Sequence, residues 1–431
     1  MNVSSAPSPA GGRRAKKGVR VAALYGGLIL GTLALVDLVC ILFGFFPPRV
    51  NPGDPEVGWR AAAPTGHMYQ ARCEEYSTGQ VFRYVRNEDG LRTSLSAQQL
   101  QQHNAAFKVA VTGDSQTDLC APNSETHFGV MERALNELGL NAVAFAYGAG
   151  KYSPLQAYLA ILKAATRYRA NALVLNFYTG NDFQDMLRVD DRPYFVAADT
   201  GYAIHAPVWY QEDPPDARYR SRVLYVLRSV AKRTGVRNVS LRIRYLYDVA
   251  NQQGSGLGTV LAYMNDLRKG VSSEVGYPAA FLAQMLNQQL FFRRFPHSRE
   301  ESTRRVRALL LMARQEHPDM LLVLSALPSY QLVQQQPVDS ALLRVLRRLP
   351  TTYEQGVREE QELYETLRGL AAETGWVFVD NLEPLRNYDG RERLFNDFDY
   401  HLLPVASEII GRAQAAAIAT ALRSGRTPYR R

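Results

Sequence analysis

Four segments of the sequence carry residues whose types suit acyl transfer. They contain Ser115, Gly150, Asn181 and the pair Asp399 and His401. A serine hydroxyl is a weak nucleophile at neutral pH, so it needs an adjacent base, and that base needs a group that fixes its tautomer. We therefore expect Ser115 to be the nucleophile and His401 its base, with Asp399 orienting the ring.

The same chemistry needs hydrogen-bond donors aimed at the negative charge that develops on the carbonyl oxygen. The candidates are the backbone N–H groups of Ser115 and Gly150 and the side-chain amide of Asn181. Each segment alone is weak evidence, because Gly-Asp-Ser and Gly-Asn-Asp are typical turn sequences and the chain has seven histidines. Their common placement in the predicted fold is what favours catalysis.

Short apolar runs predict the strands that position these residues, at 107–111, 142–146, 172–177, 320–326 and 376–380. Periodic segments between and after them predict helices at 127–138, 154–168, 298–316, 353–374 and 404–422, the third opened by a capping box of Ser298 and Glu301. This alternation predicts a parallel sheet covered on both faces. Ligands bind beyond the carboxyl ends of such strands, where the candidate segments fall.

Three segments resemble the sequence blocks of the SGNH/GDSL hydrolases. Residues 111–117 resemble the block with the nucleophile, residues 177–182 the block with the oxyanion asparagine, and residues 399–402 the Asp-x-His block. The resemblance covers about residues 107–182 and 303–422. It implies a three-layer α/β/α, flavodoxin-like fold with a five-stranded parallel sheet, and ester or acyl chemistry without a metal or cofactor.

The resemblance has departures that bear on the site. Lys151 stands about where the second block usually has glycine, which leaves Gly148 and Gly150 as alternatives for the oxyanion glycine. Asp397 competes with Asp399 for the acid role, and the family spacing favours Asp399.

The N-terminal part of the chain predicts a membrane anchor. Residues 1–20 form a basic tail that we expect to be disordered, and residues 21–46 are apolar except for Asp37. This 26-residue run exceeds the roughly 20 residues that span a bilayer core. With the basic cluster before it, the pattern predicts an uncleaved signal-anchor helix in the inner membrane, the N-terminus in the cytoplasm and the catalytic domain exported to the periplasm. A buried helix of a soluble protein is the alternative.

The rest of the chain divides into a linker and small cap at 47–105, a hydrolase domain at 106–422 with an insert at about 184–297, and a basic tail at 423–431. Helical segments are expected in the insert at about 223–232 and 279–293. Cys73 and Cys120 would share the exported, oxidising compartment, and the sequence leaves open whether they form a disulfide or stay free thiols.

The expected function is a serine esterase acting on an ester-bearing small molecule or on a cell-envelope glycan or lipid. The alternatives are an O-acyltransferase of a surface polysaccharide that uses the same triad, and a non-catalytic binding module on a hydrolase fold. The net charge of +9 suits anionic lipid or polysaccharide. Export and the lack of a recognition motif disfavour nucleic acid. The sequence does not determine the oligomeric state.

Overall fold

The computed structural model describes residues 25–28, 31–32, 35, 53–54, 56–60, 66–74, 80–103, 107–189, 192–198, 201–207, 292, 295–334, 353–396 and 400–425. The chain divides into two compact units, one of Met1–Arg49 with Pro215–Val239 and one of Val50–Pro214 with Ser240–Arg431. In the first unit, the described residues between 25 and 35 are helical. Within the described residues, no helix has the length and apolar character needed to cross a membrane.

Several sequence predictions lie wholly or largely outside the described residues. They are the tail at 1–20, the apolar run 21–46, the insert helices at 223–232 and 279–293, both candidate acids Asp397 and Asp399, and the end of the C-terminal tail. The described start of the insert forms an antiparallel hairpin of β8 (Tyr194–Ala198) and β9 (Gly201–His205).

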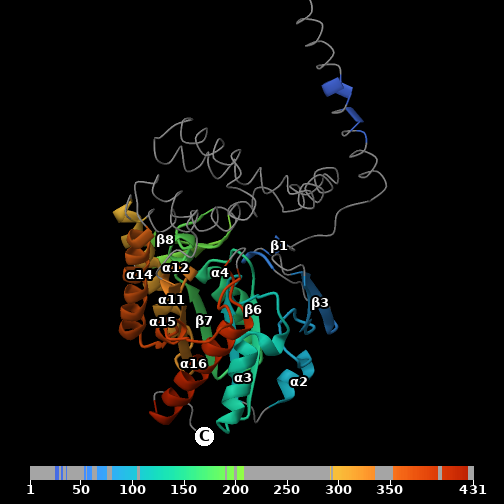
Figure 1. The fold of residues 1–431 in the computed structure, drawn as a ribbon, viewed down its shortest axis with the longest axis vertical. Helices are drawn as coiled ribbons and strands as arrows, with labels where there is room; N and C mark the ends of the chain where they lie inside the picture. Colours follow the sequence, from blue (N-terminus) through green and yellow to red (C-terminus); the bar gives the residue numbers. More distant parts are fainter. Residues whose placement is uncertain are drawn as a thin grey trace, which may run out of the picture. The chain divides into compact units, whose positions relative to one another are not determined.

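A five-stranded parallel sheet forms the centre of the second unit (Figure 1). Its strands are β5 (Phe107–Gly113), β6 (Ala142–Gly148), β7 (Ala172–Tyr178), β10 (Leu321–Leu327) and β11 (Val377–Asp380). They lie in the order β11-β10-β7-β5-β6, which is the flavodoxin-like order 2-1-3-4-5. The predicted α/β fold with a parallel sheet is therefore confirmed.

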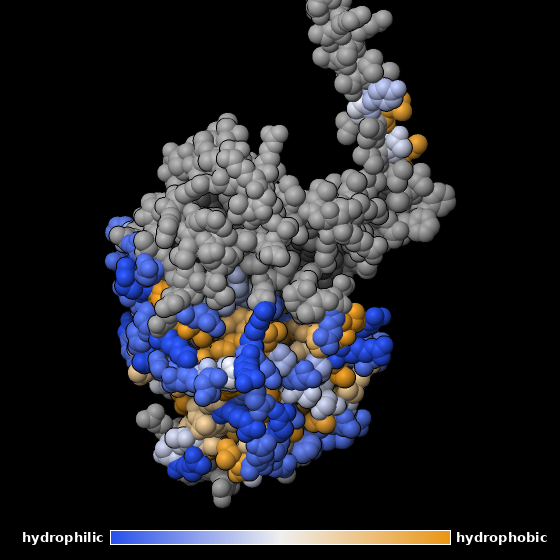
Figure 2. Space-filling view, viewed as in Figure 1, coloured by the Kyte–Doolittle hydropathy of each residue, from blue (hydrophilic) through white to orange (hydrophobic). Residues whose placement is uncertain are grey.

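Helices cover both faces of this sheet. One face packs against α3 (His127–Glu137) and α16 (Pro404–Arg423), and the other against α4 (Pro154–Arg167), α11 (Pro296–Glu316) and α14 (Tyr353–Thr374). Every residue of β5, β6, β7 and β10 is buried, as expected for strands enclosed by helices on both sides. Hydrophilic side chains predominate on the face of this unit seen in Figure 2, with hydrophobic ones scattered among them.

One predicted helix start is wrong. The capping box of Ser298 and Glu301 does not open α11, which begins two residues earlier at Pro296 with Phe295 as a cap that makes no side-chain hydrogen bond. Proline is pre-organised for the first helical position and lacks the N–H that a cap would satisfy. A true capping box is found instead at α4, where Ser153 and Gln156 bond each other's backbone.

Short elements complete the second unit. The elements before β5 are β1 (Gly53–Asp54), β2 (Gly58–Trp59), β3 (Tyr69–Glu74), β4 (Val81–Arg86) and α2 (Ala97–Gln102). The 3-10 turn η1 (Asn123–Glu125) follows β5. At the carboxyl ends of the sheet strands lie α5 (Asp182–Asp185), α12 (Tyr330–Gln334) and α15 (Leu382–Arg386). The strands β3 and β4 pair antiparallel as a hairpin.

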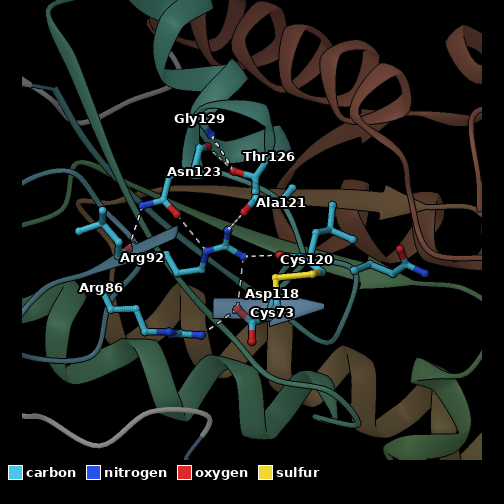
Figure 3. Close-up of polar contacts among 12 residues, drawn as sticks. Cys73, Arg86, Arg92, Asp118, Cys120, Ala121, Asn123, Thr126 and Gly129 are labelled. Atoms are coloured by element: carbon cyan, nitrogen blue, oxygen red, sulfur yellow. Dashed lines mark hydrogen bonds and ion pairs between the residues drawn. A yellow bond between two sulfur atoms is a disulfide. The ribbon is translucent and has the colours of Figure 1, made fainter. Parts of the chain in front are cut away.

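Two buried arginines fasten this N-terminal segment to the loop after β5 (Figure 3). The guanidinium of Arg92 is 1% exposed and donates to the carbonyl oxygens of Leu119 and Ala121 at 2.7 and 2.6 Å. Arg86 and Arg92 both reach Oδ1 of Asp118, at 2.8 and 3.4 Å. The carboxylate of Asp118 thus compensates two charges that would otherwise be costly to bury.

A disulfide reinforces the same junction. Cys73 on β3 is bonded to Cys120 in the loop after β5, with their Cα atoms 5.7 Å apart (Figure 3). The pairing that the sequence left open is therefore formed in the structure. Because Cys120 lies five residues after Ser115, the hairpin is covalently attached to the loop that carries the candidate nucleophile.

We predict that Arg92→Met lowers the free energy of unfolding by about 3 kcal/mol, because it removes donors from two buried carbonyl groups and a cation from Asp118. The neighbouring Arg83 is exposed on β4, so Arg83→Met should change it by less than about 0.5 kcal/mol. Urea denaturation of both variants with the disulfide intact measures the difference. Equal effects in the two variants would contradict the stabilising role of Arg92.

Candidate active site

The turn after β5 presents the candidate nucleophile. Ser115 is half-buried, whereas its neighbours Asp114 and Gln116 are buried. The carboxylate of Asp114 accepts the Gln116 N–H at 2.9 Å, and the Asp114 carbonyl accepts the Thr117 N–H at 3.1 Å. A Cβ atom on Gly113 would clash with the Thr117 hydroxyl oxygen and lie 3.0 Å from the Asn176 carbonyl oxygen, so glycine lets Thr117 and β7 approach the end of β5 this closely. The turn leaves Ser115 as its accessible residue.

The two candidate oxyanion glycines have different surroundings. A Cβ atom on Gly148 would lie 3.0 Å from the Asp114 carbonyl oxygen and 3.2 Å from the Asp118 nitrogen. Gly148 therefore lets the end of β6 pack closely against the backbone of the nucleophile turn. A Cβ atom on Gly150 would have Ser115 Cβ as its nearest neighbour, at 3.9 Å. Of the two, Gly150 lies beside the serine side chain with open space around it.

The loop before α16 brings His401 to the same turn. His401 is half-buried, and the N–H of the next residue, Leu402, donates to Gln116 Oε1 at 3.1 Å. Burial raises the pKa of Asp114 to about 6, and the nearby His401 acts in the opposite direction. Asp397 and Asp399 lie outside the described residues, so the carboxylate partner of His401 stays a prediction.

An unusual backbone conformation sets the direction of this loop. Tyr400 has a φ of 56°, in the left-handed region that a tyrosine rarely adopts. Its N–H donates to Asn396 Oδ1 at 3.1 Å, and its ring centroid lies 4.4 Å from the ring centroid of Tyr330. The carbonyl of His401 accepts the Asn396 N–H at 3.0 Å. These contacts hold Tyr400 in its strained conformation directly before the candidate base.

Asn181 directly precedes the short helix α5 as its N-cap, and its side-chain amide donates to Asp185 Oδ2 at 2.6 Å. The other oxygen of Asp185 lies 2.8 Å from Nη1 of Arg192, which is 1% exposed. Because an amide nitrogen carries two hydrogens, one can be held by Asp185 while the other serves a ligand. Burial raises the pKa of Asp182 well above its usual value, and the carboxylate of Asp114 raises it further. The Asn181 loop and the nucleophile turn leave the same edge of the sheet, because β7 and β5 are adjacent parallel strands.

The described candidates Ser115, Gly150, Asn181 and His401 lie on loops at the carboxyl edge of the sheet. Sequence reasoning assigned no role to Gln116, Asp185 or Arg192. Asp185 follows Asn181 by four residues, a spacing that suits contact within one helical turn; nothing local pointed to the other two. Within the described residues, no cluster of three histidine, cysteine or acidic side chains has the arrangement of a metal site.

Lys151 allows a test of strain beside this site. It follows Gly150, is exposed and has a φ of 71°, a conformation that costs an L-residue about 1 kcal/mol. We predict that Lys151→Gly raises the free energy of unfolding by up to about 1 kcal/mol. The control Lys163→Gly, at an exposed position inside α4, should lower it by about 1 kcal/mol. Thermal unfolding compares them, and a destabilised Lys151→Gly would show that the lysine makes a compensating contact.

No protein-family model and no curated protein matches the chain. Among solved structures, the chain is similar to the acetyl xylan esterase AlAXEase, at 10% identity over 72% of this chain and 99% of that one, with a TM-score of 0.33. It is also similar to a lipase/acylhydrolase from Enterococcus faecalis, at 12% identity over 75% and 98% of the two chains, with a TM-score of 0.33. A protein assigned to the lipolytic G-D-S-L family from Desulfitobacterium hafniense matches at 10% identity over 72% and 99%, with a TM-score of 0.32. At 10 to 12% identity these similarities concern the fold alone.

Proposed function

We propose that this chain is a serine esterase with Ser115 as nucleophile and His401 as base. The observation that carries the proposal is the contact between the two loops that bear them: the Leu402 N–H donates to Gln116 Oε1 at 3.1 Å. This hydrogen bond joins the residue after the serine to the residue after the histidine. The resemblance of the three sequence blocks to SGNH/GDSL hydrolases supports the same assignment.

The proposed reaction proceeds through an acyl-enzyme. The Ser115 hydroxyl oxygen attacks the ester carbonyl carbon while the His401 imidazole takes the hydroxyl proton. The backbone N–H groups of Ser115 and Gly150 and the Asn181 amide donate to the oxyanion. The C–O bond to the alcohol then breaks, and His401 returns the proton to the leaving oxygen. Water attacks the acyl-serine with His401 again as base, which releases the carboxylic acid and restores the serine. Asp399 is assigned the role of orienting the imidazole.

The substrate assignment is an ester-bearing small molecule, or an acyl group on a cell-envelope glycan or lipid. It follows from the proposed location, in which the signal-anchor helix at 21–46 holds the catalytic domain on the periplasmic side of the inner membrane. In an O-acyltransferase the same acyl-serine would form, and a sugar hydroxyl would attack it in place of water. The two functions therefore differ only in the acceptor, and transfer to an added sugar would be an outcome of the same assays.

We expect Ser115→Ala to lower the hydrolysis of 4-nitrophenyl acetate by at least about 10³-fold without unfolding the protein, because the nucleophile is lost. A fluorophosphonate probe should label wild-type Ser115, and His401→Ala should slow labelling by a similar factor. The controls are Ser124→Ala and His103→Ala, which replace exposed residues of the same types. A folded Ser115→Ala variant with undiminished turnover, or a His401→Ala variant labelled at the wild-type rate, would remove that residue from its role.

The location has its own test. A reporter active only after export and a reporter active only in the cytoplasm are fused in parallel after Arg431. Because the basic residues before the apolar run should stay in the cytoplasm, only the exported reporter should give a signal. A signal from the cytoplasmic reporter alone would reverse the proposed topology and remove envelope polymers as substrates.

A further inference from the structure

Gln116 lies directly after the proposed nucleophile and is 3% exposed. Its side chain and backbone contact three different parts of the second unit. The side-chain oxygen accepts the Leu402 N–H at 3.1 Å, and the backbone N–H donates to Asp114 Oδ1 at 2.9 Å. The backbone carbonyl lies 3.3 Å from Nε2 of His127. Gln116 therefore connects the serine turn, the histidine loop and the start of α3.

The contact with His127 holds the backbone carbonyl of Gln116 in place. His127 is fully buried, and burial lowers its pKa to about 4, so its ring is neutral at pH 7. A carbonyl oxygen can only accept a hydrogen bond, so Nε2 carries the proton in this contact. A side chain on Gly411 of α16 would clash with the His127 carbonyl, so α3 and α16 pack closely at this point. The Gln116 backbone is thus anchored on a rigid part of the core.

The contact with Leu402 fixes the histidine loop. Leu402 is 6% exposed, so water cannot readily replace an acceptor that is taken away from its N–H group. Leu402 is adjacent to His401 and comes two residues before Pro404, where α16 begins. On the other side of His401, the strained Tyr400 is held by Asn396. The backbone of His401 is therefore restrained from both sides. On the Leu402 side the restraint comes from Gln116 and from a short antiparallel bridge between Phe395 and Leu402, in which the Leu403 N–H donates to the Leu394 carbonyl at 2.9 Å.

We propose that Gln116 is a positioning residue, whose side-chain oxygen sets the separation between the Ser115 hydroxyl and the His401 imidazole. The inference rests on the proposed esterase function. The residue type fits the task, because the side chain is long enough to cross from one loop to the other and ends in an acceptor. A displacement of about 1 Å between reacting groups can cost about 10²-fold in rate. Gln116 touches neither substrate nor reacting atoms and acts only through the two loops.

Two substitutions distinguish the effect of losing the hydrogen-bond acceptor from the effect of changing the size of the side chain. Gln116→Met keeps the length of the side chain and removes the oxygen, whereas Gln116→Glu keeps an oxygen at the same reach. In the full chain, Gln116→Met should lower kcat for 4-nitrophenyl acetate and the rate of fluorophosphonate labelling by about 10- to 100-fold with little change in KM. Gln116→Glu should recover a substantial part of both rates.

The matched control is Gln156→Met, which removes another fully buried glutamine. Gln156 lies in α4, where its side-chain amide donates to the Val57 carbonyl and its side-chain oxygen accepts the Ser153 N–H, so it bonds to neither the serine turn nor the histidine loop. This variant should lose stability with much less effect on labelling. Equal losses of labelling in the two methionine variants, or no recovery in Gln116→Glu, would overturn the positioning role.

A third measurement does not depend on catalysis. Amide hydrogen exchange at Leu402 should become faster in Gln116→Met than in the wild type, because the N–H loses its acceptor. Unchanged exchange would show that Gln116 does not hold the loop. Failure of the probe to label the wild type would refute the esterase itself, whereas wild-type labelling that Gln116→Met leaves unchanged would refute the positioning role alone.

Discussion

The tight turn at the end of β5 is the feature on which the rest of the proposed site depends. The glycine at 113 lets the strand turn without a clash with Thr117, and the Asp114 carboxylate closes the turn by accepting the Gln116 N–H. The loops with Gly150, Asn181 and His401 can serve the proposed reaction only if they lie close to Ser115 in this turn. Gly150 lies beside Ser115, the Asn181 loop follows β7, which pairs with β5, and the histidine loop donates a hydrogen bond to Gln116.

Buried charge holds the surroundings of that turn in place. Arg92 is nearly inaccessible and donates to backbone carbonyls of the loop after the turn, while Arg192 pairs with Asp185, which holds the Asn181 amide. An uncompensated charge in such a place is strongly destabilising, so breaking either set of contacts lowers the free energy of unfolding. The geometry of the proposed site is in this way linked to global stability.

The sequence predicted much of the fold because its strands are buried on both faces. Such strands are continuous apolar runs, and the runs at 107–111 and 172–177 mark β5 and β7 to within two residues at their ends. The helix at 353–374 was predicted with the bounds of α14. The wrong start of α11 arose because Ser298 and Glu301 have the spacing of a capping box, while Pro296 sets the backbone two residues earlier. Local chemistry offered two starts, and the one with proline in the first helical turn is formed.

The sequence by itself determined which residue types are present at the ends of the strands, and hence the class of chemistry to consider. Only the tertiary structure decided how they meet. It distinguished Gly150, beside the serine, from Gly148, packed against the turn. It also revealed the hydrogen bond between Gln116 and Leu402, which are 286 residues apart in the chain. Hydrophobic periodicity and turn signals are local properties of a sequence, whereas a contact between distant loops follows from the order of the strands and the packing of α3 and α16.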